Sequence, residues 1–356
     1  MTNPFKFGSV VDGDFFTNRT SEKHEIEAVL KSSNHLILVS PRRYGKTSLI
    51  SRVTSDLDRP TIYLDLQLVT DVSDMATQLL KRVLKLNKWE KVRHHLSNFR
   101  IVPTIEINPR TDAVEVSFSP SVSDSFIALE DVLNLIEKIG EKGKRVVVVL
   151  DEFQEITSLS KTLPKQLRAV IQHHSNINYV FLGSVESMMR RVFETKKSPF
   201  YHFGVLMTLG RIPYDDFREY LSKGLSKLTL KSDVLASEIL TITSCHPYYT
   251  QQLGFYCYTY LEDNKYQKET LSKVIERIIE LRSKDYDQLW NTLNKTDKKL
   301  LITLASDTNV SNIGIPTSTV YSGLSRLTNQ GYLINNGSYT FDDPFFKKWI
   351  IKMRSL

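Results

Sequence analysis

The sequence predicts an α/β fold, in which helices cover both faces of a parallel sheet, followed by an all-helical region and a small C-terminal domain. Three observations support this prediction. Up to about residue 213, segments with strand patterns alternate with segments of helical periodicity, which is typical of a parallel sheet. The four consecutive valines at residues 146–149 suit a strand that is buried on both faces. After residue 213, helical patterns follow one another with no strand between them.

Length and composition describe an ordinary globular protein with room for two or three domains. The chain has 356 residues, of which 41% are hydrophobic and 24% are charged. Two cysteines fit a reducing compartment, and the sequence contains neither a membrane-length apolar run nor a signal-peptide pattern. We therefore expect a cytoplasmic protein with no membrane partner. The formal net charge of +7 permits nucleic-acid binding without requiring it.

In the first half, strands are expected where short apolar runs are bounded by turn residues, and helices where apolar residues recur every three to four positions. The expected strands cover residues 35–39, 61–66, 145–150, 178–183 and 204–209, and the expected helices cover residues 21–32, 46–57, 73–86, 89–96, 125–138, 161–174 and 188–193.

An insertion interrupts this alternation. Residues 101–107 and 113–118 alternate apolar and polar side chains, and the turn-rich residues 108–112 lie between them. This pattern predicts a β-hairpin inserted into the α/β core over residues 101–118. Its role is left open between a surface decoration and a strand edge that docks a partner.

The region after residue 213 is predicted to be an all-α lid domain. Its helical patterns cover residues 214–225, 232–243, 247–261 and 268–293.

The last segment is predicted to be a winged helix. Two helical patterns, residues 295–306 and 318–330, precede strands at 332–334 and 339–341 that are joined by a tight asparagine–glycine turn. Helix, turn, helix and small hairpin, in this order, are typical of a winged helix. The predicted domains are therefore residues 1–213, 214–293 and 294–356.

Residues 40–47 are predicted to form a phosphate-binding loop of the Walker A type. An apolar run precedes them and a helical pattern follows, which is the context that separates such a loop from a basic turn of no particular purpose. Backbone N–H groups at the helix start would point at phosphate. Lys46 would neutralise the phosphate oxygens, and the Thr47 hydroxyl would bind Mg²⁺. Ser40 stands where a first glycine is usual, and a serine fits there unless φ must be positive.

Two acids follow the valine-rich strand. Asp151 would lie at the carboxyl end of a buried strand, where open α/β sheets bind their ligands, and would hold Mg²⁺ directly or through water. Glu152 would orient or deprotonate the water that attacks the γ-phosphate, as a Walker B glutamate does. The alternative, that both acids only cap the following helix, is disfavoured by the phosphate loop upstream.

Ser184 follows a strand that is predicted to lie beside Asp151. Its hydroxyl could sense the γ-phosphate or hold the attacking water, or it could cap the helix that follows. Arg190, Arg191 and Arg211 are candidates for cations that stabilise the transition state, although a basic solvated face explains each of them equally well.

These motifs resemble the prokaryotic archaeal-type P-loop ATPases of the STAND branch, relatives of AAA+ proteins that are similar in layout to origin-recognition-type initiators. The matching segments are Phe16-Thr17-Asn18-Arg19 with Glu22, Pro41-Arg42-Arg43-Tyr44-Gly45-Lys46-Thr47-Ser48-Leu49, Leu150-Asp151-Glu152-Phe153-Gln154, Leu182-Gly183-Ser184, Cys245-His246-Pro247-Tyr248 with Gln251, and Asp343-Pro344-Phe345-Phe346 with Trp349.

The resemblance implies an ASCE or AAA+-like P-loop sheet that binds ATP or ADP together with Mg²⁺. It places Phe16 and Arg19 near the adenine, and Pro247 and Tyr248 on the lid that closes over the nucleotide. The expected catalytic residues are Glu152, Lys46 and Ser184, and the expected Mg²⁺ ligands are Thr47 and Asp151. The expected nucleotide-binding residues are Phe16, Arg19, Pro41, Arg42, Arg43, Tyr44, Gly45, Lys46, Thr47, Ser48, Pro247 and Tyr248.

The sequence departs from this family at two points. Cys245 replaces a glycine of the lid motif. Relatives carry Tyr-Gly-Arg after the sensor strand, whereas here Tyr201 is followed by His202 and Phe203. If that arginine acts in trans in relatives, hydrolysis stimulated by assembly is in doubt for this chain.

The predicted winged helix carries little charge for a DNA-binding module. From residue 286 onward eight Lys or Arg residues face five Asp residues, and the expected recognition helix holds the single strong cation Arg326. Phosphate contacts depend on several cations. DNA binding and protein docking, including packing against the lid, are therefore both left open for this domain.

The leading functional hypothesis is an ATP-dependent conformational switch with slow hydrolysis and a regulatory or signalling role. A nucleotide-stabilised binding module with negligible turnover and a DNA-binding or DNA-loading ATPase are the alternatives. A guanine-nucleotide switch is disfavoured, because the Asn-Lys-Thr-Asp sequence at residues 294–297 lies in the helical region with no strand before it. A protein partner and self-association are left open.

Overall fold

The structure is a computed structural model, and it describes residues 2–11, 13–17, 19–86, 89–107, 114–118, 124–140, 144–184, 186–308, 310, 314–335 and 337–354. The chain forms two compact units. We call Arg19–Pro41 with Lys46–Leu209 the core unit, and Met1–Asn18 with Arg42–Gly45 and Gly210–Leu356 the helical unit. The division into three domains stays a prediction.

The core unit is built on a five-stranded parallel sheet, as predicted. Its strands are β1 (Leu36–Val39), β2 (Thr61–Asp65), β5 (Val146–Asp151), β6 (Ile177–Gly183) and β7 (Val205–Thr208). They lie in the order β2-β5-β6-β1-β7, and all four neighbouring pairs are parallel. Because parallel strands end at the same edge of a sheet, the segments that follow β1, β5 and β6 emerge together at its carboxyl edge.

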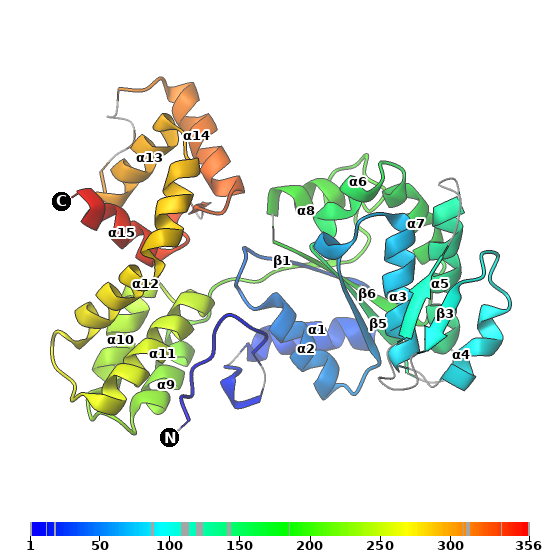
Figure 1. Cartoon of the computed structure of the whole chain (residues 1–356), viewed down its shortest axis with the longest axis horizontal. Helices are drawn as coiled ribbons and strands as arrows, with labels where there is room; N and C mark the ends of the chain where they lie inside the picture. The colour runs from blue at the N-terminus through cyan, green and yellow to red at the C-terminus, as the bar shows by residue number, and fades with distance from the viewer. Residues whose placement is uncertain are drawn as a thin grey trace. The chain divides into compact units, whose positions relative to one another are not determined.

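Helices cover both faces of this sheet (Figure 1). On one face, the side chains of Val146, Val148 and Leu150 pack into a core with α3, α5 and α7. The residues between them, Val147 and Val149, point to the other face, which α1 and α2 cover. The helices of the unit are α1 (Thr20–Lys31), α2 (Lys46–Asp56), α3 (Val72–Leu86), α4 (Trp89–Leu96), α5 (Ser125–Gly140), α6 (Ile156–Leu159), α7 (Leu163–Ile171) and α8 (Glu186–Phe193).

The inserted hairpin forms a separate two-stranded antiparallel sheet. It consists of β3 (Thr104–Ile107) and β4 (Val114–Ser117), which pair as predicted, whereas its turn at residues 108–113 lies outside the described residues. Val116 is buried, and β4 packs against α3. The role of the hairpin stays a prediction.

An aromatic cluster anchors the chain just after Asp151 and Glu152, at the end of β5. The Phe153 ring lies 4.5 Å from the Phe181 ring and 5.2 Å from the Phe200 ring, and Phe193 joins the same cluster. All four side chains are buried. The cluster therefore fixes the backbone immediately after Glu152, and it also holds the segment in which the family arginine is absent.

The helical unit contains two groups of elements joined by the long helix α12 (Figure 1). The first group is α9 (Tyr214–Leu225), α10 (Ser232–Thr243) and α11 (Pro247–Asp263), and α12 covers Thr270–Thr292. The second group is α13 (Lys295–Ala305), α14 (Thr317–Asn329), the antiparallel strands β8 (Leu333–Asn335) and β9 (Tyr339–Phe341), and α15 (Pro344–Arg354). The predicted helices and hairpin are present, although Asn336 of the predicted turn lies outside the described residues. The assignment of this group as a winged helix stays a prediction.

The last helix, α15, was not expected from the sequence. Asp343 begins it, because its Oδ1 atom accepts hydrogen bonds from the backbone N–H groups of Phe345 (2.8 Å) and Phe346 (3.1 Å). Its Oδ2 atom accepts hydrogen bonds from Arg282 and from the Tyr286 hydroxyl, which joins α15 to α12. The Asp-Pro-Phe-Phe motif is thus a helix start, with an N-cap acid and a proline in the first turn.

No helix in the described part of the chain combines the length and apolar character needed to cross a membrane. Both cysteines are free thiols, and Cys257 is buried.

His35, immediately before β1, gives the core unit a pH-dependent stability. The side chain is 8% exposed, and its Nδ1 atom accepts a hydrogen bond from the Tyr179 backbone N–H at 3.2 Å. Burial, assisted by the charges of Arg168 and His174, lowers the pKa of His35 to about 4. The unfolded chain, with the ordinary pKa of 6.5, therefore binds an extra proton between these two values. The contribution of His35 to stability is thus complete above pH 6.5 and is lost as the pH falls towards 4.

We expect the unfolding free energy of the parent to fall by roughly 2 kcal/mol through this group between pH 7.5 and pH 5. Urea unfolding at the two pH values measures this change. The variant His35→Gln should lack that part of the fall, whereas replacing the exposed His24 by Gln should leave it intact. An equal fall in the parent and in His35→Gln would show that His35 does not carry the effect.

Candidate active site

The phosphate loop joins β1 to α2 and accommodates a serine in the first glycine position. Ser40 is buried, its N–H donates to the carbonyl of Gly183 on β6 at 3.2 Å, and its φ is not positive. The left-handed positions of the loop fall instead at Arg43, with φ of 67°, and at Gly45, with φ of 86°. The departure at Ser40 therefore causes no backbone strain.

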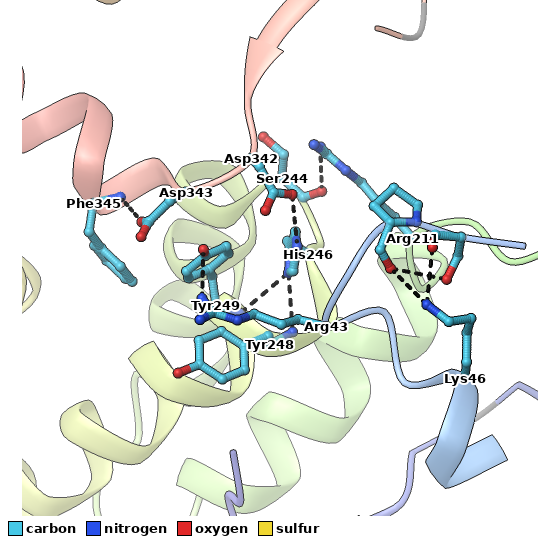
Figure 2. A network of polar contacts seen from close by, with 12 residues as sticks. Arg43, Lys46, Arg211, Ser244, His246, Tyr248, Tyr249, Asp342, Asp343 and Phe345 are labelled. Carbon is cyan, nitrogen blue, oxygen red and sulfur yellow. Dashed lines mark hydrogen bonds and ion pairs between the residues drawn. The ribbon is translucent and has the colours of Figure 1, made fainter. Parts of the chain in front are cut away.

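Lys46 begins α2 with its ammonium group turned back over the loop. Figure 2 shows the Lys46 side chain. The side chain is 7% exposed, and Nζ donates hydrogen bonds to the carbonyl oxygens of Ser40 (3.0 Å) and Pro41 (3.3 Å). These bonds hold a positive charge beside the backbone N–H groups at the start of α2. Such an arrangement can bind an anion.

The two expected metal ligands lie together in the core unit. The Thr47 hydroxyl donates to Asp151 Oδ2 at 3.2 Å, and Asp151 Oδ1 accepts from the Glu152 backbone N–H at 2.9 Å. Burial raises the pKa of Asp151, the charge of Glu152 adds to this effect, and the Glu152 N–H bond and the charge of Lys46 oppose it. A hydroxyl and a carboxylate oxygen are the hard ligands that suit Mg²⁺.

Glu152 is held by donors on two sides. Its Oε2 atom accepts from the Ser184 hydroxyl at 2.6 Å, the Ser184 N–H at 3.3 Å and the Gln154 side-chain amide at 2.5 Å. Its backbone has a φ of 50°, an unfavourable conformation for a residue with a side chain, and such conformations cluster at functional sites. Ser184 thus contacts Glu152 directly, and its predicted catalytic role stays a prediction.

Two residues of this site were not expected from the sequence to take part in it. Tyr63 on β2 contacts both Thr47 and Asp151, and Gln154 contacts Glu152. Gln154 belongs to the Leu-Asp-Glu-Phe-Gln motif, so its position two residues after Glu152 is a signal for a contact with that carboxylate. Tyrosine is common in strands, so no local signal marks Tyr63 as a residue of the site.

The residues expected near the adenine and on the lid are divided between the two units. Arg19, in the core unit, is 4% exposed, has a φ of 63°, and pairs with Glu22 of the same motif at 2.7 Å. Phe16, Pro247 and Tyr248 belong to the helical unit, in which Pro247 is the first residue of α11. Asn18 of the motif lies outside the described residues. The roles of these side chains towards the nucleotide stay predictions.

Arg43 and Tyr44, the middle residues of the loop, contact the start of α11 within the helical unit. The Arg43 guanidinium lies over the Tyr248 ring, 4.7 Å from the centroid, and its Nη1 donates to the Tyr249 hydroxyl at 3.2 Å (Figure 2). Tyr44 is buried and packs edge-on against His246, with ring centroids 4.8 Å apart. The preceding arginine, at position 42, is exposed. Two successive loop residues thus reach the lid motif.

His246 fixes the start of α11. Its Nδ1 atom accepts from the N–H groups of Tyr248 (3.2 Å) and Tyr249 (3.5 Å), so the ring proton of the neutral imidazole must lie on Nε2. Nε2 is 3.3 Å from Asp342 Oδ1, just before α15 (Figure 2). His246 occupies a variable position of the lid motif. Only its place just before Pro247 indicates that it could be the N-cap of α11.

Two of the three candidate transition-state cations make local contacts. Arg190 on α8 pairs at 2.8 Å with Glu194, the residue just after the end of this helix, and Arg211 donates to the Ser244 carbonyl at 2.9 Å. Arg191 is exposed on α8. Their roles in catalysis stay predictions.

A family profile described as an ATPase domain predominantly from Archaea matches residues 16–253. The chain belongs to this family. Membership of the archaeal ATPase family makes the protein an ATPase with a nucleotide-binding P-loop core. A comparison with curated proteins finds no match.

The fold is similar to that of solved structures over almost the whole chain. A Walker-type ATPase of Pyrococcus abyssi is 18% identical, with a TM-score of 0.68 over 98% of this chain and 99% of that chain. The ORC2 protein of Aeropyrum pernix, solved with ADPNP and ADP, is 12% identical, with a TM-score of 0.53 over 99% and 100%. A mutant form of the RuvB protein of Thermotoga maritima is 14% identical, with a TM-score of 0.51 over 94% and 95%. At these identities the likeness concerns the fold alone.

Proposed function

We propose that the protein is a Mg²⁺-dependent ATPase that turns over slowly and uses its nucleotide state as a conformational switch. The contact of Thr47 with Asp151, next to a Glu152 carboxylate held by Ser184, carries this proposal. These groups lie at the carboxyl edge of one sheet, in one compact unit with Lys46. They supply a phosphate-binding cation, two oxygen ligands and a general base.

Each of these side chains has a distinct task in the proposal. Lys46 binds the β- and γ-phosphate oxygens, and Thr47 with Asp151 holds Mg²⁺. When bound, Mg²⁺ neutralises charge on the phosphate oxygens. Glu152 orients the attacking water and accepts its proton.

The hydrogen bonds around Glu152 suit a general base. Among the described residues, every hydrogen bond to this carboxylate reaches Oε2. The other oxygen, Oε1, is therefore available to a water molecule. Ser184 and Gln154 would act on the reaction by holding this carboxylate in place, as positioning residues.

The absence of the family arginine supports slow turnover. In this chain, the segment around Phe200 is packed into the aromatic cluster and carries no arginine from Ser198 to Phe203. Removing a transition-state arginine from a phosphoryl-transfer site typically lowers the rate about a thousandfold or more. If turnover were negligible, the protein would be the nucleotide-stabilised binding module that the sequence leaves as an alternative.

In the second group of the helical unit, α13 to α15, helix α14 gives no support to a role in DNA binding. Its single strong cation, Arg326, makes two hydrogen bonds to the buried Asp297 of α13, at 2.6 and 3.0 Å. A cation committed to this pair contributes little to phosphate binding. We therefore favour docking of a protein as the task of this group.

The switch part of the proposal rests on Arg43. Residues of one continuous loop belong to both units, and Arg43 contacts two tyrosines of α11. A phosphate group that reorganises the loop would change these contacts, and α11 would respond.

Backbone hydrogen–deuterium exchange along α11 tests this step. We expect its exchange rates to differ at least about fivefold between the ATP-loaded and ADP-loaded protein. The variant Arg43→Ala should lose this difference while it still binds both nucleotides, because the loop binds phosphate through its backbone N–H groups and Lys46. Arg52→Ala, which removes an arginine of α2 that pairs with Asp56, should keep it. A difference that persists in Arg43→Ala would exclude Arg43 as the link.

A further inference from the structure

Tyr63 reaches the two expected metal ligands from a third element. β2 pairs with β5 so that Tyr63 lies opposite Val149, and Asp151, two residues further along β5, points to the same face. The Tyr63 hydroxyl donates a hydrogen bond to Asp151 Oδ2 and lies 3.2 Å from Thr47 Oγ1. Oxygen atoms from β2, α2 and β5 therefore meet at one point.

This contact fixes the orientation of the Asp151 carboxylate. Oδ1 accepts from the Glu152 N–H, and Oδ2 accepts from Tyr63 and Thr47. A hydroxyl group has one proton and two lone pairs, so Thr47 can keep donating to Asp151 while a lone pair faces a cation. Tyr63 adds a second donor to Oδ2, from a half-buried ring that the sheet holds in place. The carboxylate thus cannot rotate without breaking bonds at both oxygens.

We propose that Tyr63 is a positioning residue of the metal site, whose hydroxyl holds the Asp151 carboxylate in the orientation that binds Mg²⁺. This inference rests on the proposed function and adds a residue to the same site. Mg²⁺ demands near-ideal octahedral geometry and is bound by few carboxylates together with water and phosphate oxygens, so the orientation of each carboxylate matters. Partners that orient a metal ligand typically change metal affinity about 10- to 100-fold.

The test is a Mg²⁺ titration of ATP binding by the full chain, followed by calorimetry. In Tyr63→Phe, which keeps the ring and removes only the hydroxyl, we expect the Mg²⁺ concentration for half-maximal enhancement of ATP binding to rise about tenfold. ATP affinity in excess EDTA should stay at the parent value. The turnover number at saturating Mg²⁺ should recover towards that of the parent, because the carboxylate is displaced and not removed.

Tyr179→Phe is the matched control. The Tyr179 hydroxyl lies 2.8 Å from His174 Nδ1, and Tyr179 pairs with Val148, so it points to the opposite face of the sheet from Asp151. This variant loses one tyrosine hydroxyl from the same sheet and should keep the parent Mg²⁺ midpoint.

The outcomes separate this inference from the proposed function. A parent protein whose ATP binding does not respond to Mg²⁺ would contradict the proposed function and, with it, the role of Tyr63. A responsive parent with an unchanged or lower midpoint in Tyr63→Phe would overturn the role of Tyr63 alone. An equal shift in Tyr179→Phe would also overturn it, because the effect would then be a general consequence of lost packing.

Discussion

Replacing Lys46 by alanine should weaken ATP binding at least about a hundredfold. A hydrogen bond to a charged group contributes about 1.5–3 kcal/mol, and Lys46 would bind more than one phosphate oxygen, while each 1.4 kcal/mol changes an affinity about tenfold. Calorimetric titration with ATP and Mg²⁺ measures the loss.

A suitable control is Lys31→Ala in the same unit. Lys31 is exposed at the end of α1 and pairs only with Glu27 among the contacts described for it. This variant should bind ATP like the parent. Thermal melting of Lys46→Ala checks that the loop still folds without the bonds to Ser40 and Pro41. Parent-like ATP affinity in a folded Lys46→Ala variant would refute the phosphate-binding assignment of the loop.

Replacing Glu152 by glutamine should stop turnover while ATP stays bound. The amide keeps the size of the carboxylate and an oxygen that accepts a hydrogen bond from Ser184, but it cannot accept the proton of the attacking water. Loss of a general base typically lowers a rate about 10²- to 10⁴-fold. Phosphate release under saturating ATP and an independent binding titration separate the two effects.

Glu155→Gln is the matched control, because it makes the same change one turn after Glu152. Among the described hydrogen bonds of the Glu155 side chain, the only partner is the Ser158 hydroxyl. It should turn over like the parent. If Glu152→Gln hydrolyses ATP as fast as the parent, the general base lies elsewhere. The ATP-locked variant is also the form with which to isolate a protein partner.

The α/β part of the fold could be predicted because its signals are local. The valines of β5 indicate a strand buried on both faces, and the apolar run before Ser40 indicates a strand that leads into a loop. The full order of the strands is less accessible: the strand before Ser184 is predicted beside the strand of Asp151, and β6 does pair with β5, but no local pattern places β1 on the other side of β6. That order depends on which apolar faces pack together across the whole sheet. The helix α15 was missed although Asp343 and Pro344 form a recognisable helix start.

The candidate site was predictable only for residues that lie in sequence motifs. Residue type and spacing predict Lys46, Thr47, Asp151 and Glu152 as site residues, and the structure brings the last three of them together at one edge of the sheet. The contact of Tyr63 with Asp151 arises from the pairing of two strands, and strand register is set by tertiary packing and not by spacing along the chain. The contacts of Arg43 with α11 depend in the same way on residues more than two hundred positions away.

We propose above all that the core unit binds ATP with Mg²⁺ and hydrolyses it slowly. Phosphate release by the purified protein, followed with ATP in the presence of Mg²⁺ or of excess EDTA, tests this claim most directly. We expect slow release that requires Mg²⁺ and that disappears in Lys46→Ala and in Glu152→Gln. Release that continues in EDTA, or that survives both substitutions, would contradict it.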